Sequence, residues 1–271
     1  MRVFYTLLII TVASSLVGAQ DMRTYGVKIN VTDMSKAKEF YCDQLGFEVE
    51  RQISESYILL KTNDQNKLFL HKVPLLLPES EKETTAGLTL QVNDLDKSIA
   101  SLKAKGVDFG DARKRKEGVG YAMDVKNPFS KKVSLMHQTV GEVKPFKEPL
   151  IYNYGYLIPD MEKAIEFYSG MLGFAERSKR YLPLDMPLGH SDGSFGFMLH
   201  YRVGVEPTQF NISDNEHLVI LFQTENISEA IKKLSDKGVR FLETNPVESP
   251  IGKYISFYDP FGYLSELYEI K

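Results

Sequence analysis

The sequence predicts an α+β fold of four strand–helix–strand–strand–strand (βαβββ) units, paired into two domains with cupped mixed sheets. The first reason is an internal repeat within the 271-residue chain. The segment Asp-Met-Ser-Lys-Ala-Lys-Glu-Phe-Tyr at 33–41 returns in similar form at 160–168, and Leu-Gly-Phe at 45–47 returns at 172–174. Both matches are 127 residues apart, so the two halves are expected to share one fold.

A second repeat joins the later parts of the two halves. Residues 102–109 match residues 234–241, and Asn-Pro-Phe at 127–129 matches Asp-Pro-Phe at 259–261, now 132 residues apart. The second half has therefore gained five residues between the two matches, in stretches rich in Pro, Gly, Asp and Ser that are typical of loops.

The first unit shows each expected element in order. Val27, Ile29 and Val31 alternate with polar residues, which is the period of a half-buried strand. Asp33 is then a natural N-cap, and Gly46 suits the position after a helix, where a positive φ is required. The helix between them has an apolar stripe, formed by Ala37, Phe40, Tyr41 and Leu45. Two strand-like runs follow it, at residues 57–61 and 67–72.

The second unit repeats this order. Leu88, Leu90 and Val92 alternate as a strand, Asp94 follows as an N-cap, and Gly106 ends the helix. The helix carries the apolar residues Ile99 and Leu102. Two strand-like runs follow it, at residues 121–125 and 132–137. The second half of the chain carries two further units of the same kind.

Length and composition agree with two globular domains, which we expect at residues 22–140 and 148–271, in a monomer or a homodimer. Hydrophobic residues make up 43% and charged residues 25%, which is ordinary for a soluble protein. The net charge of −3 gives no electrostatic reason to bind nucleic acid. A single cysteine forms no internal disulfide and excludes zinc sites built from cysteine clusters.

The first 19 residues have the pattern of a secretory signal peptide. Arg2 is followed by a short apolar run, and small residues stand at Val17 and Ala19. Cleavage after Ala19 would release a secreted or periplasmic protein that has no membrane attachment. The alternative is a single anchoring helix, for which the run is short and lacks a following basic cluster.

The repeated motif resembles the vicinal oxygen chelate superfamily, which includes glyoxalase I, extradiol dioxygenases and the fosfomycin and bleomycin resistance proteins. The motif Asp-x-x-x-Ala-x-x-Phe-Tyr-x-x-x-Leu-Gly-Phe is near-ideal at 160–174, and 259–267 looks like the family's closing hairpin. The resemblance implies glyoxalase-like domains, in which paired units curl a sheet around a small-molecule cavity. It also implies a divalent metal there, which chelates neighbouring substrate oxygens.

The resemblance places the family's metal-ligand positions on this chain. In domain 1 they fall on Gly26, Gly87 and Ser134. Two glycines and a serine do not make a divalent-metal site, so no metal is expected in domain 1.

In domain 2 the ligand positions fall on Asn153, a weak ligand, and on Val219 and Glu266. His217 lies two residues before Val219 on the same strand face, and His200 could supply another imidazole. We predict a metal site of His200, His217 and Glu266, suited to Fe, Mn, Zn, Ni or Co with open positions. The alternative is that Glu266 pairs with a neighbouring side chain and that the histidines are ordinary strand residues.

Other polar residues share the face opposite to the core. Lys28 lies there on the first strand and could hold an anionic ligand, although a lysine at a sheet edge more often reaches water. Tyr268 follows Glu266 by two residues and could orient it. We predict Lys28, Asn153 and Tyr268 as substrate-binding residues and Glu266 as the metal ligand or general base. His190, in a Gly- and Asp-containing loop, is expected to be a lid residue or solvated.

Taken together, the residues and the resemblance predict an exported glyoxalase- or dioxygenase-like protein with a small-molecule cavity. Metal-dependent lyase, isomerase or dioxygenase chemistry would belong to domain 2. The alternative is a metal-free protein that binds or sequesters a small molecule, as bleomycin resistance proteins do. In a third reading, domain 1 is a structural partner that closes the sheet of domain 2.

Overall fold

The computed structural model describes residues 22–62, 66–76, 86–141, 143–204 and 217–271. The predicted signal peptide lies outside these ranges. No helix in the described part of the chain is long and apolar enough to cross a membrane.

The described residues form the four expected βαβββ units. Unit 1 comprises β1 (Arg23–Val31), α1 (Met34–Lys38), the π-helical segment η1 (Glu39–Gln44), β2 (Glu48–Ser54), β3 (Tyr57–Lys61) and β4 (Lys67–Lys72). Unit 2 comprises β5 (Ala86–Gln91), α2 (Leu95–Ala104), β6 (Arg115–Glu117), β7 (Gly120–Asn127) and β8 (Ser130–Gln138). Unit 3 comprises β9 (Leu150–Ile158), α3 (Met161–Ile165), η2 (Glu166–Met171), β10 (Ala175–Glu176), β11 (Asp185–Gly189) and β12 (Phe195–Tyr201). Unit 4 comprises β13 (Leu218–Gln223), α4 (Ile227–Asp236), β14 (Val247–Ser249), β15 (Gly252–Tyr258) and β16 (Leu264–Ile270).

The helices begin and end at the predicted residues. The Asp33 carboxylate accepts hydrogen bonds from the backbone N–H groups of Ser35 and Lys36 and so caps α1. The helical segment η1 that continues α1 is followed by Gly46, whose φ of 87° is strained for residues with a side chain. Gly173 repeats this geometry in unit 3, with the same φ of 87°.

The strands form two eight-stranded sheets, and each sheet draws strands from both halves of the chain. Sheet A has the order β14-β15-β16-β13-β1-β4-β3-β2, which joins units 1 and 4. Sheet B has the order β10-β11-β12-β9-β5-β8-β7-β6, which joins units 2 and 3. The expected pairing of units into two mixed sheets is confirmed, but the partners come from different halves. The ranges 22–140 and 148–271 therefore describe the sequence repeat, and neither half builds a complete eight-stranded sheet alone.

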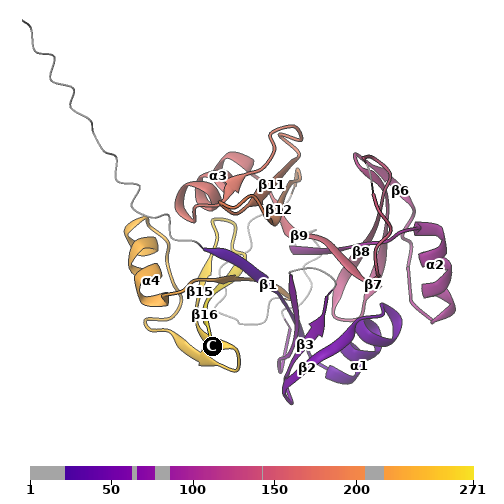
Figure 1. The fold of residues 1–271 in the computed structure, drawn as a ribbon, viewed down its shortest axis with the longest axis horizontal. Helices are drawn as coiled ribbons and strands as arrows, with labels where there is room; N and C mark the ends of the chain where they lie inside the picture. Colours follow the sequence, from indigo (N-terminus) through magenta and orange to yellow (C-terminus); the bar gives the residue numbers. More distant parts are fainter. Residues whose placement is uncertain (1–21, 63–65, 77–85, 142, 205–216) are drawn as a thin grey trace, which may run out of the picture.

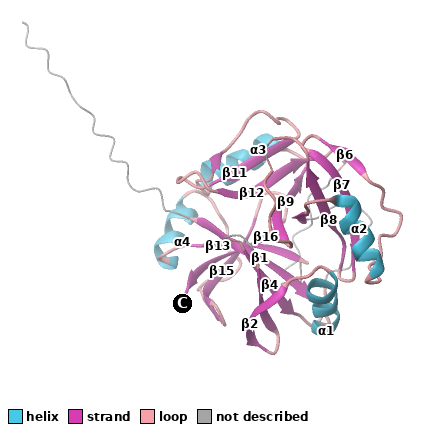
Figure 2. Ribbon diagram, turned by 45° about the vertical axis from the view of Figure 1, so that its right-hand side comes forward, coloured by secondary structure: helices cyan, strands magenta, loops and turns pink. Residues whose placement is uncertain are grey.

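Each sheet turns one face toward a shared core. The helices lie at the periphery, and β1 and β9 lie near the middle of the molecule (Figure 1). The strands curl, as a second view shows (Figure 2). Val27, Ile29 and Val31 belong to the main core cluster together with helix residues, as their alternation predicts.

A separate apolar cluster covers the other face of sheet A. We call this the Lys28 face, because Lys28 and Glu266 lie among its side chains. It is formed by Tyr57, Leu59, Phe69, Val219, Leu221, Ile251, Leu264 and Tyr268.

Candidate functional site

The centre of the Lys28 face is a buried ion pair between the two halves of the chain. The Lys28 Nζ atom lies 2.5 Å from Glu266 Oε1, and the two side chains are 7% and 5% exposed. Lys28 stands opposite Val219 on β13, and Glu266 stands beside Leu221 on that same strand, so the lysine reaches diagonally across one strand. The structure therefore realises the alternative in which Glu266 pairs with a neighbouring side chain. Lys28 is buried, in contrast to the exposed position that is usual for a lysine at a sheet edge.

Two tyrosines lie on the same face but differ in their bonding. The Tyr268 hydroxyl donates to Glu266 Oε2 over 2.9 Å, so Lys28 and Tyr268 together hold both carboxylate oxygens. The Tyr57 hydroxyl is buried and makes no hydrogen bond of ordinary geometry with the described residues. Burial, and then the charge of Glu266, raises the pKa of Tyr57 well above its usual value, so its hydroxyl stays protonated.

His71 also lies on this face and is held neutral. Its Nδ1 atom donates to the Asn30 side-chain oxygen over 3.1 Å, and its ring packs against that of Tyr57. Burial, and then the neighbouring charge of Lys28, lowers the pKa of His71 to about 4. Above that pH, His71 therefore adds no charge beside the ion pair of Lys28 and Glu266.

The predicted metal ligands His200, His217 and Glu266 are not brought together. His200 lies on β12 of sheet B, where its Nδ1 atom is 2.7 Å from Asp185 Oδ1. His217 precedes β13 and lies four residues before Leu221, the neighbour of Glu266, which is roughly 13 Å along a strand. No three His, Cys, Asp or Glu side chains in the described ranges could hold a metal ion. The three predicted ligands come from two sheets and from distant rows, so they do not converge.

Sheet B carries a row of polar residues on the face opposite to its core. Asn153 on β9 stands beside Thr89 on β5, which stands beside Ser134 on β8, which stands beside Asp124 on β7. Ser134 donates to Asp124 over 2.6 Å, and Arg115 on β6 lies 2.9 Å from the same carboxylate. Of the predicted substrate-binding residues, Asn153 thus lies on sheet B, whereas Lys28 and Tyr268 lie on sheet A.

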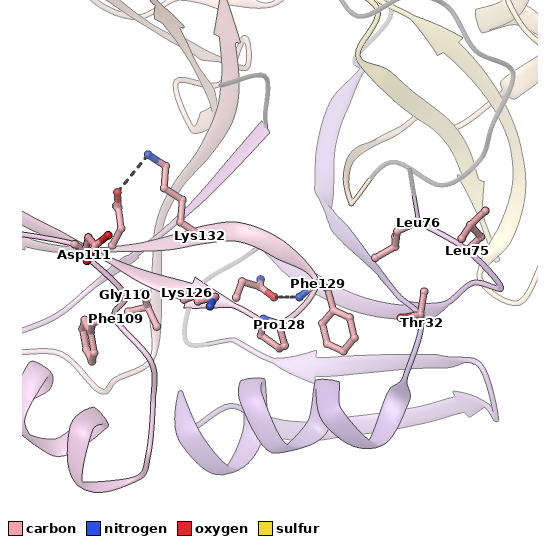
Figure 3. A pocket seen from close by; sticks show the side chains of 14 residues that line it. Thr32, Leu75, Leu76, Phe109, Gly110, Asp111, Lys126, Pro128, Phe129 and Lys132 are labelled. Carbon is pink, nitrogen blue, oxygen red and sulfur yellow. Dashed lines mark hydrogen bonds and ion pairs between the residues drawn. The ribbon is translucent and has the colours of Figure 1, made fainter. Parts of the chain in front are cut away.

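A cavity of about 730 Å³ opens at one end of this polar face. Figure 3 shows Thr32, Leu75 and Leu76 on one side of it and Pro128 and Phe129 facing them. The remaining walls are formed by Phe109, Gly110, Asp111, Ala112, Asp124, Val125, Lys126, Asn127 and Lys132.

The charges that line the cavity are mostly paired. Lys132 forms an ion pair with Asp124, and Lys126 forms one with Asp108, each at 3.2 Å. Asp111 has no hydrogen-bond or ion-pair partner among the described residues. The walls therefore combine apolar surface with one uncompensated carboxylate. The sequence predicted a cavity but not these residues. Asp124 and Lys126 are two residues apart on one strand, as are Lys132 and Ser134 on the next, and this spacing could have placed each pair on one face of the sheet.

The sequence profile of the Glyoxalase/Bleomycin resistance protein/Dioxygenase superfamily matches the chain at residues 25–130 and 151–267. The chain belongs to this superfamily. The predicted resemblance is thereby confirmed at the level of the family.

Solved structures of the superfamily fold agree with this assignment. Glyoxalase I from Zea mays aligns with a TM-score of 0.67 at 18% identity, with 92% of each chain covered. A putative dioxygenase from Bacillus subtilis aligns with a TM-score of 0.61 at 11% identity, over 93% of this chain and 86% of that one. At these identities the likeness shows the fold alone. No curated protein sequence matches the chain.

The residues of this superfamily member do not fit a divalent metal on sheet A. A Cβ atom at Gly26, one of the ligand positions implied by the resemblance, would overlap the backbone carbonyl oxygen of Lys67. A ligating side chain at that position would therefore require β4 to move. Val219 offers no donor atom, and the oxygens of Glu266 are bound by Lys28 and Tyr268.

The superfamily repeat also places a buried polar pair in each half. In the first half, the Asn127 side-chain N–H group donates to the Tyr41 hydroxyl over 2.8 Å. In the second half, the Tyr168 hydroxyl donates to Asp259 over 2.8 Å. Burial raises the pKa of Asp259 to about 6, against the lowering effect of hydrogen bonds from Tyr168 and from backbone N–H groups.

His190 was expected to be a lid residue or solvated, and the solvated alternative was wrong. It is 6% exposed and links the two sheets. Its Nε2 atom accepts from the backbone N–H of Thr24 on β1 over 2.9 Å, so Nδ1 carries the proton that it shares with Ser194 Oγ at 2.7 Å. Arg23 binds Asp192 in the same loop. The polar composition of the loop suggested solvent, whereas segments distant in sequence bury it.

Proposed function

We propose that the protein is an exported, small-molecule-binding member of the superfamily, and that its ligand occupies the cavity on sheet B without a metal ion. The observation that carries the proposal is the cavity of about 730 Å³ between the β7–β8 hairpin of sheet B and the residues Thr32, Leu75 and Leu76 of unit 1. Ligand pockets typically have about 300–1,000 Å³ and mix apolar walls with a few placed polar groups. The Lys28 face of sheet A, in contrast, is covered by buried aromatic and aliphatic side chains.

The chemistry of the walls favours a ligand with an apolar body and a positive group. Phe129, Leu75 and Leu76 supply apolar contacts, and Asp111 supplies a carboxylate without a partner among the described residues. The two lining lysines are already paired with Asp108 and Asp124. Ion pairs at exposed carboxylates are weak, so the apolar contacts would supply most of the affinity.

Metal-dependent lyase, isomerase or dioxygenase chemistry is less well supported by the geometry. It would need His200, His217 and Glu266 to converge, and they lie on two sheets and in distant rows. Glu266 would also have to exchange Lys28 for a metal ion.

A thermal-shift screen tests the binding proposal. The mature protein would be screened in EDTA against small organic cations and natural-product antibiotics. Hits are expected to bind Asp111→Asn and Leu75→Ala severalfold more weakly than the wild type, whereas the exposed control Val203→Ala binds normally. Hits that bind all variants equally, or that bind only after metal is added, would contradict the proposal.

Export is part of the same proposal and rests on residues 1–19, which lie outside the described residues. Expression with its own N-terminus in a secreting host is expected to give a protein that begins at Gln20. Intact-mass measurement of the protein outside the cytoplasm checks this; retention of Met1 would contradict it.

A further inference from the structure

The two sheets of this chain differ in one buried charge pair. The 127-residue repeat places Gly155 where Lys28 stands, and the 132-residue repeat places Ser134 where Glu266 stands. Sheet A therefore has both members of the pair and sheet B has neither. If either charge were present alone, a buried ion would lack a partner, which is costly.

The pair is isolated from other ions and from solvent. Among the described residues, Glu266 has no other cationic partner than Lys28, and Lys28 has no other acidic one. The side chains are 7% and 5% exposed, and the surrounding Tyr57, Phe69 and Val219 are apolar or neutral. Neutralisation of Glu266 therefore depends on this one ammonium group.

We propose that Lys28 is a built-in cation of sheet A: its ammonium group neutralises Glu266 in the place that a divalent metal ion would otherwise take. Lys28 is then a positioning residue that holds the Glu266 carboxylate by its charge. The inference rests on the metal-free part of the proposed function. Its test does not involve ligand binding on sheet B, so the two can fail separately.

Stability measurements on paired variants test the charge dependence. Lys28→Met is expected to lower Tm by about 10 °C, because it leaves a buried carboxylate without a counter-ion. The double variant Lys28→Met/Glu266→Gln should recover most of this loss, because no charge remains. Equal Tm values for Lys28→Met and the wild type would overturn the inference, and so would a double variant that is less stable than Lys28→Met.

Chemical rescue separates the charge of Lys28 from its packing. In Lys28→Ala, n-butylammonium is expected to raise Tm, because it can place a cation beside Glu266 in the space left by the side chain. n-Butanol has a similar shape and no charge, so it should give a smaller rise. An equal rise with both compounds would show that Lys28 only fills space, and would overturn the inference.

Discussion

At the residue scale, Tyr57 and Tyr268 form a natural comparison, because both hydroxyls are buried on the Lys28 face and only that of Tyr268 donates to Glu266. Tyr268→Phe is expected to cost about 1.5–3 kcal/mol, the usual range for a hydrogen bond to a charged group. Tyr57→Phe removes a hydroxyl that makes no hydrogen bond of ordinary geometry with the described residues, so it should cost less than Tyr268→Phe. Urea unfolding of both variants checks this, and equal losses would contradict it.

Asp259 predicts an unusual pH dependence. Its folded-state pKa of about 6 exceeds the unfolded value of 3.8, so the folded protein binds more protons, and this group's contribution to stability is lost as pH rises from 4 to 6. The total is about 3 kcal/mol at neutral pH. Asp259→Asn, which copies Asn127, should remove this loss, and Asn127→Asp should add a second one. Urea unfolding between pH 4 and 7 measures both, and unchanged profiles would contradict the assignment.

Residue patterns predicted the faces of the site residues but not their partners. Alternation placed Lys28, Glu266 and Tyr268 opposite to the core, because that information is local to each strand. The Lys28–Glu266 contact joins residues that are 238 positions apart, and no local pattern encodes such a distance.

At the scale of elements, a hydrogen bond from the backbone N–H of Thr24 to His190 joins β1 to the loop between β11 and β12. His190→Ala is expected to cost about 1–3 kcal/mol, because the backbone N–H of Thr24 loses its acceptor in a partly buried setting. Denaturant unfolding measures the effect, with the exposed Val203→Ala as a control that should change little. A loss no larger than that of the control would show that the link does not stabilise the contact.

Elements were more predictable than their arrangement. The N-caps Asp33 and Asp160 and the following glycines Gly46 and Gly173 were readable, because caps are decided within a few residues. The sequence did not predict which first strands pair with each other. β1 pairs with β13 and β5 pairs with β9, and these pairings depend on contacts between segments that are distant in the sequence.

At the scale of the whole molecule, the shared sheets predict that neither half folds alone. Fragments cut between β8 and β9 would each contain only half of the strands of each sheet. The strands at the cut edge, such as β1 and β5, would lose their partners β13 and β9 and expose unpaired backbone groups. We expect each fragment to be unfolded or aggregated alone and the two to form one folded complex when co-expressed. Circular dichroism and size-exclusion chromatography check this, and a folded monomer of residues 22–140 would contradict it.

The molecule should also lose stability in mild acid through two histidines. Burial lowers the pKa of His217 to about 4, and burial and then Lys28 lower that of His71 to about 4. The unfolded chain takes up these protons near pH 6.5, so the histidine contribution is present above that pH and is lost as pH falls toward 4. The double variant His71→Gln/His217→Gln should flatten this part of the profile in chemical unfolding. An Asp259→Asn variant that keeps both histidines and yet loses no stability between pH 6.5 and 4 would contradict the prediction.

The tight approach of β1 to β4 also decides where new chemistry can be engineered. Any side chain grafted at Gly26 meets the Lys67 backbone, whereas a Cβ at Gly87 meets no atom within 4 Å. Gly87 lies on sheet B, whose polar row already contains Asn153 and Ser134. A designer who wants a transition-metal catalyst on this scaffold should therefore graft histidine and glutamate onto sheet B and leave sheet A untouched.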